Sequence, residues 1–156
     1  LVSDKNLLLL SQYLAVQTSN IVSYNNLSQV SGLNYRQVIK HLNILNETFI
    51  CEDVSPFFRN RQKELSRNPK IFFNDLGFRN NLIDNMNTLD KRPDAGALVE
   101  NAVFVRLKEI CVETARINFW HTKSGAEVDF VLSHSEKITP IEVKFSNFDS
   151  LIFFHI

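Results

Sequence analysis

The stretch "SGAEVDFVLSHSEKITPIEVKFS" (residues 124–146) decides how the second half of this 156-residue chain is interpreted. It contains two runs that are typical of buried β-strands, "AEVDFVL" and "PIEVKFS", separated by a polar segment. Charged residues interrupt both runs: Asp129 lies in the first, and Glu142 and Lys144 lie in the second. Because burial of an unpaired charge is costly, these residues need partners. The pattern predicts a site at which charged side chains of different strands meet.

Side-chain alternation along a strand predicts which of these charges share a face of the sheet. Three strands are predicted, at residues 117–121, 127–132 and 141–145. In the second strand Asp129 is expected on the face opposite Phe130, and in the third Glu142 and Lys144 are expected opposite Val143. If these two strands are neighbours, Asp129, Glu142 and Lys144 converge.

A helix is predicted in "PDAGALVENAVFVRLKEICVET", and it contains a fourth charged residue, Glu100. Apolar residues follow Glu100 at three, four, seven and eleven positions, which places this carboxylate on the apolar stripe. Oxygen ligands from two or three carboxylates suit Mg²⁺ or Mn²⁺, and a nearby lysine can orient water or stabilise charge on a phosphate. We therefore expect Glu100, Asp129 and Glu142 to bind a divalent ion and, with Lys144, to form a catalytic site.

Each of these residues also has a simpler structural interpretation. Asp129 alone fits an exposed residue on a strand that is half in water. Glu142 and Lys144, two residues apart, fit a surface ion pair. The whole set is more specific than its members, because a helix Glu, a strand Asp and a Glu-x-Lys on the following strand occur in one chain.

The first half of the chain has the pattern of a helix-turn-helix. Helices are predicted at residues 4–15, 25–30 and 34–48. Gly32 is expected to end the second helix, and apolar residues at i, i+1, i+4 and i+7 from Val38 form one stripe of the third. Arg36 and Lys40 are expected on the opposite, outward face of that helix. This arrangement is typical of DNA-binding helix-turn-helix proteins.

Two further strands are predicted in "FICEDVSPFF" and "PKIFFND", with the basic segment "RNRQKELSRN" between them. Residues 59–70 contain five Lys and Arg against one Glu, a net charge of 5 − 1 = +4. Such a hairpin resembles the wing of a winged helix and would contact phosphates. The predicted nucleic-acid-binding residues are Arg36, Lys40, Arg59, Arg61, Lys63 and Arg67. A protein-docking role for the same elements is the alternative.

Length and composition restrict the class of protein. A polar segment, "DKRPDAG", predicts a boundary between a winged-helix domain at residues 1–90 and a second domain at residues 91–156. The 17 basic and 17 acidic residues cancel, and no apolar run is long enough to span a membrane. Two isolated cysteines fit the reducing cytoplasm. Since the chain begins with Leu rather than Met, we expect it to be a piece of a longer protein.

Several quoted stretches carry a resemblance to a known family. "SRNPKIFFNDLGFRNNL", "GALVENAVFVRLKE", "FWHTKSGAEVDFVL" and "PIEVKFS" resemble the C-terminal region of a family of predicted prokaryotic AAA+ ATPases. In that family a winged helix and a PD-(D/E)xK nuclease-like domain of unknown function follow the ATPase module. The resemblance implies an α+β fold, with Glu100, Asp129, Glu142 and Lys144 at the nuclease motif and Glu127 beside them. Val128 stands where the motif has Pro.

The resemblance implies an accessory C-terminal module of an AAA+ ATP-binding protein. No Gly-x-x-x-x-Gly-Lys-Ser/Thr sequence is present, so ATP would bind upstream. About ten residues follow "IEVKFS", and the nuclease-like domain is therefore expected to be truncated. The alternatives are an active Mg²⁺-dependent nuclease, or a non-catalytic module for protein interaction or dimerisation. DNA, the upstream ATPase module or another protein, or a second copy of the chain are the expected partners.

Overall fold

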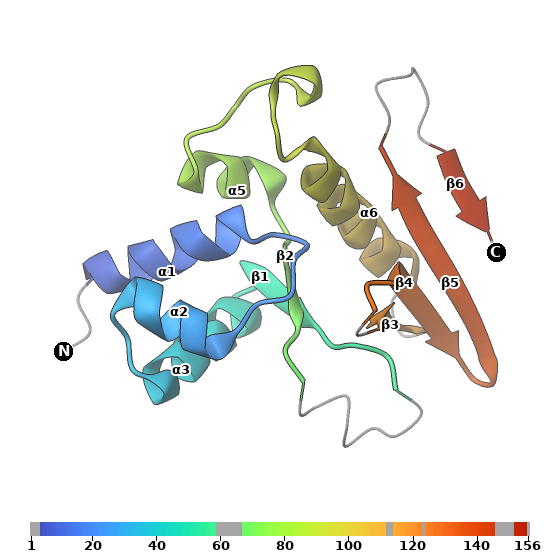
Figure 1. The fold of residues 1–156 in the computed structure, drawn as a ribbon, viewed down its shortest axis with the longest axis horizontal. Coiled ribbons are helices and arrows are strands. Elements are labelled where there is room, and N and C mark those ends of the chain that lie inside the picture. Colours follow the sequence, from blue (N-terminus) through green and yellow to red (C-terminus); the bar gives the residue numbers. More distant parts are fainter. Residues whose placement is uncertain (1–3, 59–66, 112–113, 123, 146–151, 156) are drawn as a thin grey trace.

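The computed structural model describes residues 4–58, 67–111, 114–122, 124–145 and 152–155, and these form the mixed α+β fold that was predicted (Figure 1). Three helices come first: α1 (Asp4–Val16), α2 (Tyr24–Ser31) and α3 (Tyr35–Glu47). They lie on one side of the molecule, close to the positions expected from hydrophobic periodicity. In the described part of the chain, no helix combines the length and apolar character needed to cross a membrane.

The turn between α2 and α3 has a clear local cause. Gly32 ends α2 with a φ of 69°, in the left-handed region that glycine adopts without a Cβ penalty. Asn34 then begins α3: its side chain accepts a hydrogen bond from the backbone of Gln37, and the Gln37 side chain accepts one from the backbone of Asn34. This capping box fixes the start of α3 two residues after the glycine.

A β-hairpin follows the three helices. Strands β1 (Cys51–Val54) and β2 (Lys70–Phe73) pair antiparallel, with Cys51 opposite Phe73 and Val54 opposite Lys70. Every residue of β2 is buried. Strand β2 therefore lies in the interior of the protein, whereas β1 is only partly buried.

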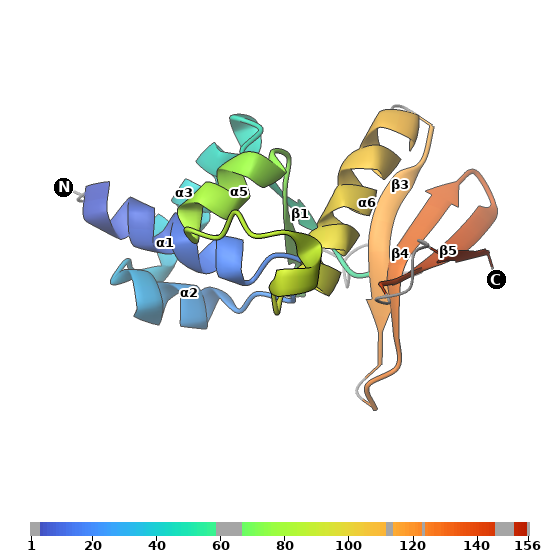
Figure 2. The same ribbon diagram turned by 90° about the horizontal axis from the view of Figure 1, so that it is seen from above.

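The second half combines one long helix with an antiparallel sheet. Helix α6 (Ala95–Cys111) lies between the helical half and the sheet, whose strands are in the order β3-β4-β5-β6 (Figures 1 and 2). The strands are β3 (Arg116–His121), β4 (Glu127–His134), β5 (Lys137–Lys144) and β6 (Ile152–His155). The last strand, β6, was not among the three strands predicted for this half of the chain.

Two hydrophobic clusters form the core. The first joins α1, α2, α3 and the hairpin, and includes Leu10, Leu14, Leu27 and Val38. The members of the second come from the hairpin, α6 and the sheet: Val54, Phe72, Val103, Phe104, Phe119 and Phe130. Residues on both sides of the predicted boundary at residue 90 thus contribute to the second cluster.

Backbone pairing also joins the two halves. The segment after β1 runs alongside β3: Phe57 N donates to Phe119 O at 2.5 Å, and Phe119 N donates to Ser55 O at 3.3 Å. On α6, Asn101 is fully buried, and its amide donates to Phe73 O at 2.7 Å while its Oδ1 accepts from Phe73 N at 2.8 Å. Asn101 thereby pairs with both backbone polar groups of Phe73.

A buried ionic network connects α1 to the start of α6. Arg79, on the short helix α5 (Leu76–Leu82), is fully buried; its Nε donates to Ala15 O at 2.8 Å and its Nη1 to Asp94 at 2.5 Å. Arg92 donates to the same Asp94 carboxylate at 2.7 and 3.0 Å. The hydrogen bond from Arg92, opposed by burial but reinforced by Arg79, holds the pKa of Asp94 well below its usual range.

Candidate functional site

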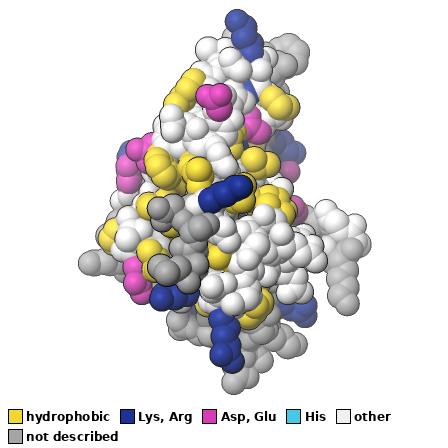
Figure 3. Space-filling model, turned by 90° about the vertical axis from the view of Figure 1, so that its left-hand side faces the viewer, with side chains coloured by type: hydrophobic (Ala, Val, Ile, Leu, Met, Phe, Trp, Pro, Cys, Tyr) yellow, Lys and Arg dark blue, Asp and Glu magenta, His cyan; other side chains and the backbone are white. Residues whose placement is uncertain are grey.

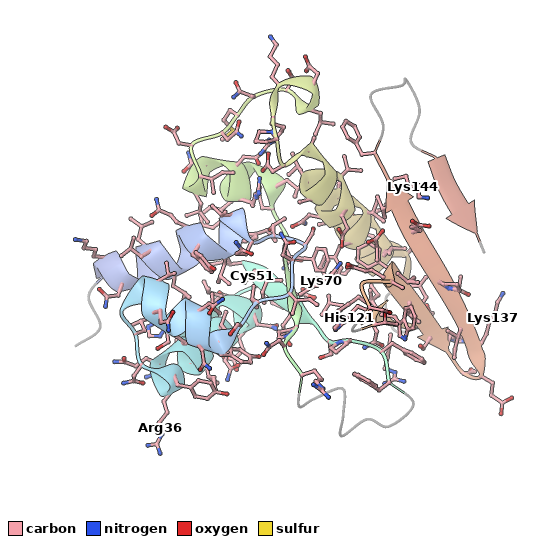
Figure 4. All side chains as sticks on the ribbon, viewed as in Figure 1. Arg36, Cys51, Lys70, His121, Lys137 and Lys144 are labelled. Atoms are coloured by element: carbon pink, nitrogen blue, oxygen red, sulfur yellow. The ribbon has the colours of Figure 1, made fainter. Side chains whose placement is uncertain are left out.

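A buried lysine brings acidic residues of the second half together. Lys70, the first residue of β2, is 2% exposed and lies at the centre of the molecule (Figure 4). Its Nζ is 2.9 Å from Glu100 Oε1 on α6 and 2.5 Å from Glu127 Oε1 on β4. The ammonium also lies 5.4 Å from the centre of the Phe119 ring. Contacts from three separate segments therefore fix this side chain.

The charge state of this lysine follows from opposing effects. Burial favours the neutral amine and by itself lowers the pKa of Lys70, but Glu100 and Glu127 reverse this effect, so that the pKa is raised above its usual value. The two carboxylates thus favour the charged ammonium form of Lys70. The Glu100 side chain is 14% exposed, whereas the Glu127 side chain is 44% exposed. The ion pairs of Lys70 are therefore open to solvent at Glu127.

Glu100 is the carboxylate most affected by burial. Burial raises its pKa to about 7, an increase that Lys70 opposes and that Asp129 and Glu127 reinforce through like charge. The prediction that Glu100 lies on the buried stripe of its helix agrees with its placement. Its environment is also the one expected of a carboxylate that exchanges a proton near neutral pH.

Asp129 lies in the same electrostatic neighbourhood. Its Oδ2 accepts a hydrogen bond from Val143 N on β5 at 2.7 Å. Burial raises the pKa of Asp129, whereas the Val143 hydrogen bond and Lys70 lower it, and Glu127 and Glu142 raise it again, with a net increase. We refer to Lys70, Glu100, Glu127 and Asp129 as the Lys70 cluster.

A β-bulge interrupts the side-chain alternation that was predicted along β4. Asn118 pairs with Val131 and Trp120 pairs with Val128, so that one residue of β3, Phe119, faces two residues of β4. The extra residue breaks the period of two. Phe130 and Val131 are consequently both buried, whereas strict alternation placed them on opposite faces. The bulge lies at Asp129 and Phe130.

The predicted Glu142 and Lys144 occupy a different environment. Ile141 and Val143 pack toward the second hydrophobic cluster, so that alternation directs Glu142 and Lys144 to the other face of β5. Lys144 Nζ lies 3.3 Å from Glu142 Oε1, and these side chains are 58% and 37% exposed. The ammonium that contacts Glu100 is that of Lys70, while Lys144 lies near the outer end of β5 (Figure 4).

In this arrangement each predicted metal ligand has a partner within the protein. One oxygen of Glu100 is paired with Lys70, one of Asp129 accepts from Val143 N, and one of Glu142 faces Lys144. Within the described ranges, no group of three or more His, Cys, Asp or Glu side chains is arranged to hold a metal ion. The place between Glu100 and Glu127 is taken by an ammonium group.

The predicted nucleic-acid-binding residues are described only in part. Arg36 and Lys40 are exposed on α3, and Arg36 projects away from the body of the protein (Figure 4). Arg67 is also exposed. The remaining three predicted contacts lie outside the described residues: Arg59, Arg61 and Lys63.

Lys70 is the site residue that the sequence-based prediction missed. It was counted among the basic residues 59–70 of the hairpin, which were expected to contact phosphates. The signal that could have identified it is the one used for Asp129: a charge within an apolar strand, here "KIFF". Such a charge requires a buried partner of opposite sign.

Comparison with known protein families finds two matches, to consecutive regions of the chain. Residues 3–89 match the family described as "Domain of unknown function (DUF8612)". Residues 95–154 are similar to the family described as "Domain of unknown function (DUF4143)". Two relatives are "Uncharacterized protein Mb2031c" of Mycobacterium bovis and "Uncharacterized protein Rv2008c" of Mycobacterium tuberculosis. Each is 28% identical over 107 residues, which are 67% of this chain and 24% of the relative.

The chain thus spans about a quarter of the length of the curated relatives it matches. No solved structure matches it. The first of the two family matches covers more than half of the chain and includes α1, α2, α3, the hairpin and α5. On this basis, the protein belongs to the DUF8612 family of unknown function.

Proposed function

We propose that this chain is an accessory, non-catalytic module of an AAA+ ATP-binding protein and that it binds nucleic acid through a winged helix. The observation that carries the non-catalytic part is the Lys70 ammonium, which lies 2.9 Å from Glu100 and 2.5 Å from Glu127. A metal-dependent nuclease would need a divalent ion among these carboxylates. Here a side chain from the helix-turn-helix half supplies the cation.

The nucleic-acid-binding part is supported by the order and exposure of the elements. Helix α3 follows a short glycine turn, carries exposed Arg36 and Lys40, and is followed directly by the β1–β2 hairpin. In winged helices this helix enters the major groove, and the hairpin contacts the adjacent backbone. The proposal that the module serves an ATPase is supported by the family resemblance of the quoted stretches, and by relatives about four times as long as the matched region.

We expect Arg36→Ala/Lys40→Ala to weaken binding to double-stranded DNA by about tenfold at moderate salt, because two phosphate or base contacts are lost. The plot of log K against log salt has a negative slope, and its magnitude should become smaller by about 1.8, since each phosphate contact contributes about 0.9. Fluorescence anisotropy in EDTA measures both quantities and excludes metal-dependent cleavage during the experiment.

A matched control removes two exposed lysines that lie elsewhere, with Lys91→Ala/Lys137→Ala. This variant has the same net charge as the α3 variant, and its affinity should stay within about twofold of the wild type. Absence of DNA binding by the wild type, or equal losses in the two variants, would show that α3 is not the binding surface.

A divalent-metal nuclease is the second candidate. It is favoured by the proximity of Glu100 and Asp129, which come from segments distant in sequence and whose pKa values are both raised. This candidate requires Lys70 to leave the carboxylates so that a metal ion can replace it. The two candidates therefore differ in which cation lies among the carboxylates of the Lys70 cluster in solution: the Lys70 ammonium or a metal ion.

A further inference from the structure

A cleft lies where the helical half and the sheet half of the protein meet. Its volume is about 310 Å³, and it is bordered by β1, the C-terminal half of α6 and β3. Figure 2 shows α6 beside the sheet, with β1 on the other side of the helix. Small-molecule sites are often found at such junctions, with volumes that begin at about 300 Å³. We call this feature the β1–α6 cleft; its lining includes Glu52, Val54, Phe104, Lys108 and Ile117.

Part of the cleft lining is apolar and belongs to the core. Val54 and Phe104 are 4% and 2% exposed, and both are members of the second hydrophobic cluster. Ile117 packs against the same cluster but is only half-buried, so part of its side chain is left for a ligand to cover. An apolar group bound here would extend the core and lose its own contact with water.

The cleft also contains an ion pair that joins the two halves. Lys108 Nζ donates to Glu52 Oε1 and, at 2.9 Å, to Asn74 Oδ1. The side chains of Lys108 and Glu52 are 31% and 23% exposed, so the pair is neither buried nor fully solvated. The ammonium lies 5.9 Å from the centre of the Phe104 ring, beside the apolar lining. On the helical end of the molecule, by contrast, charged groups of both signs are scattered over a mainly uncharged described surface (Figure 3).

Each charged group of this pair has an unused hydrogen-bonding position. Among the described residues, Lys108 donates two of its three N–H groups. Glu52 Oε1 accepts from Lys108 and from Asn74, whereas Glu52 Oε2 accepts from no described residue. Asp53 also lines the cleft, but its carboxylate accepts from Asn46 of α3, on the other side of β1. The pair therefore offers one donor and one acceptor to a ligand.

We propose that the β1–α6 cleft binds a free α-amino acid with an apolar side chain. The carboxylate of the ligand accepts from Lys108, its ammonium donates to Glu52, and its side chain covers Val54 and Ile117. The four charges then alternate in sign, so that every charge has an oppositely charged neighbour. A wholly apolar ligand would bury the unused donor and acceptor without partners, and a ligand with a single charge would satisfy only one of them.

Isothermal titration calorimetry tests the proposal with L-leucine, L-valine and L-phenylalanine as probes. At least one of them is expected to bind with a dissociation constant below about 1 mM. Its analogue without the carboxylate and its analogue without the amino group should each bind at least about tenfold more weakly, because each leaves one charge of the pair unmatched. For leucine these analogues are isoamylamine and isocaproate. Absence of saturable binding by all three amino acids, or an analogue that binds as tightly as its amino acid, would overturn the proposal.

Neutral variants locate the site. Glu52→Gln and Lys108→Gln should each weaken binding of the tightest amino acid by about tenfold, because each removes one charge-assisted hydrogen bond to the ligand. The matched controls Glu109→Gln and Arg106→Gln neutralise an exposed ion pair of α6 and should leave the affinity within about twofold of the wild type. Equal losses in the cleft variants and the controls would contradict binding between Lys108 and Glu52.

Methyl NMR spectra of the wild type decide the matter if a cleft variant does not fold. The tightest amino acid should shift the signals of Val54 and Ile117, which line the cleft. It should leave unchanged the signals of Leu27 and Val38, which lie in the first hydrophobic cluster. Shifts that spare Val54 and Ile117 would place the binding elsewhere and overturn the proposal.

Discussion

Lys70→Met is expected to lower the free energy of unfolding by about 3–5 kcal/mol, the usual cost of removing one partner of a buried ion pair. Lys70 is 2% exposed, and its ammonium is shared by Glu100 and Glu127. Methionine fills the space of the lysine stem but leaves Glu100 enclosed without a cation. Urea denaturation of the wild type and the variant at neutral pH measures the difference.

Two further variants show how much of the stability lost in Lys70→Met is due to the broken ion pair. Lys70→Met/Glu100→Gln removes both charges and should regain at least half of the loss, since the uncompensated carboxylate is gone. Lys144→Met removes the lysine that the sequence placed at the site, and should cost less than about 1 kcal/mol because its ion pair is largely exposed. A loss of under about 1 kcal/mol for Lys70→Met would show that the buried pair does not hold the two halves together.

Arg79→Met is expected to cost about 3–4 kcal/mol of unfolding free energy. The guanidinium is fully buried; it donates to Ala15 O at the end of α1 and to Asp94 at the start of α6. Methionine keeps the apolar contacts of the side chain, but it removes the Arg79 donor from Ala15 O and leaves Asp94 with Arg92 as its remaining arginine partner. The loss should appear in thermal and urea unfolding.

A surface arginine supplies the matched control for this change. Arg106 is 70% exposed and pairs with Glu109 one helical turn away, so Arg106→Met should change stability by less than about 0.5 kcal/mol. Equal effects of the two substitutions would mean that the Arg79 network contributes no more than a surface pair.

Local patterns predicted most of the secondary structure. The burial of Glu100 follows from its place on an apolar helical stripe, and the turn before α3 follows from Gly32. These features depend on residues that are close in sequence, where helix and turn geometry impose a fixed spacing. The described helices and most of the strands therefore lie near their predicted positions.

Features that depend on distant segments were not predictable in the same way. The bulge at Phe119 depends on how β3 pairs with β4, and no local sequence feature fixes that register. The ion pair of Lys70 with Glu100 joins residues 30 positions apart and forms only once β2 is packed in the interior. Strict alternation accordingly did not anticipate that Phe130 and Val131 are both buried. The lysine that reaches Glu100 was counted with the basic residues of the hairpin.

The cation that occupies the Lys70 cluster distinguishes the accessory module from the metal-dependent nuclease. A crystal structure grown in the presence of Mn²⁺, with anomalous diffraction data, identifies this cation directly. Lys70 Nζ is expected to remain within hydrogen-bonding distance of Glu100 and Glu127, with no manganese peak among the carboxylates. A manganese ion bound by Glu100 and Asp129, with the Lys70 side chain turned away, would contradict the non-catalytic assignment.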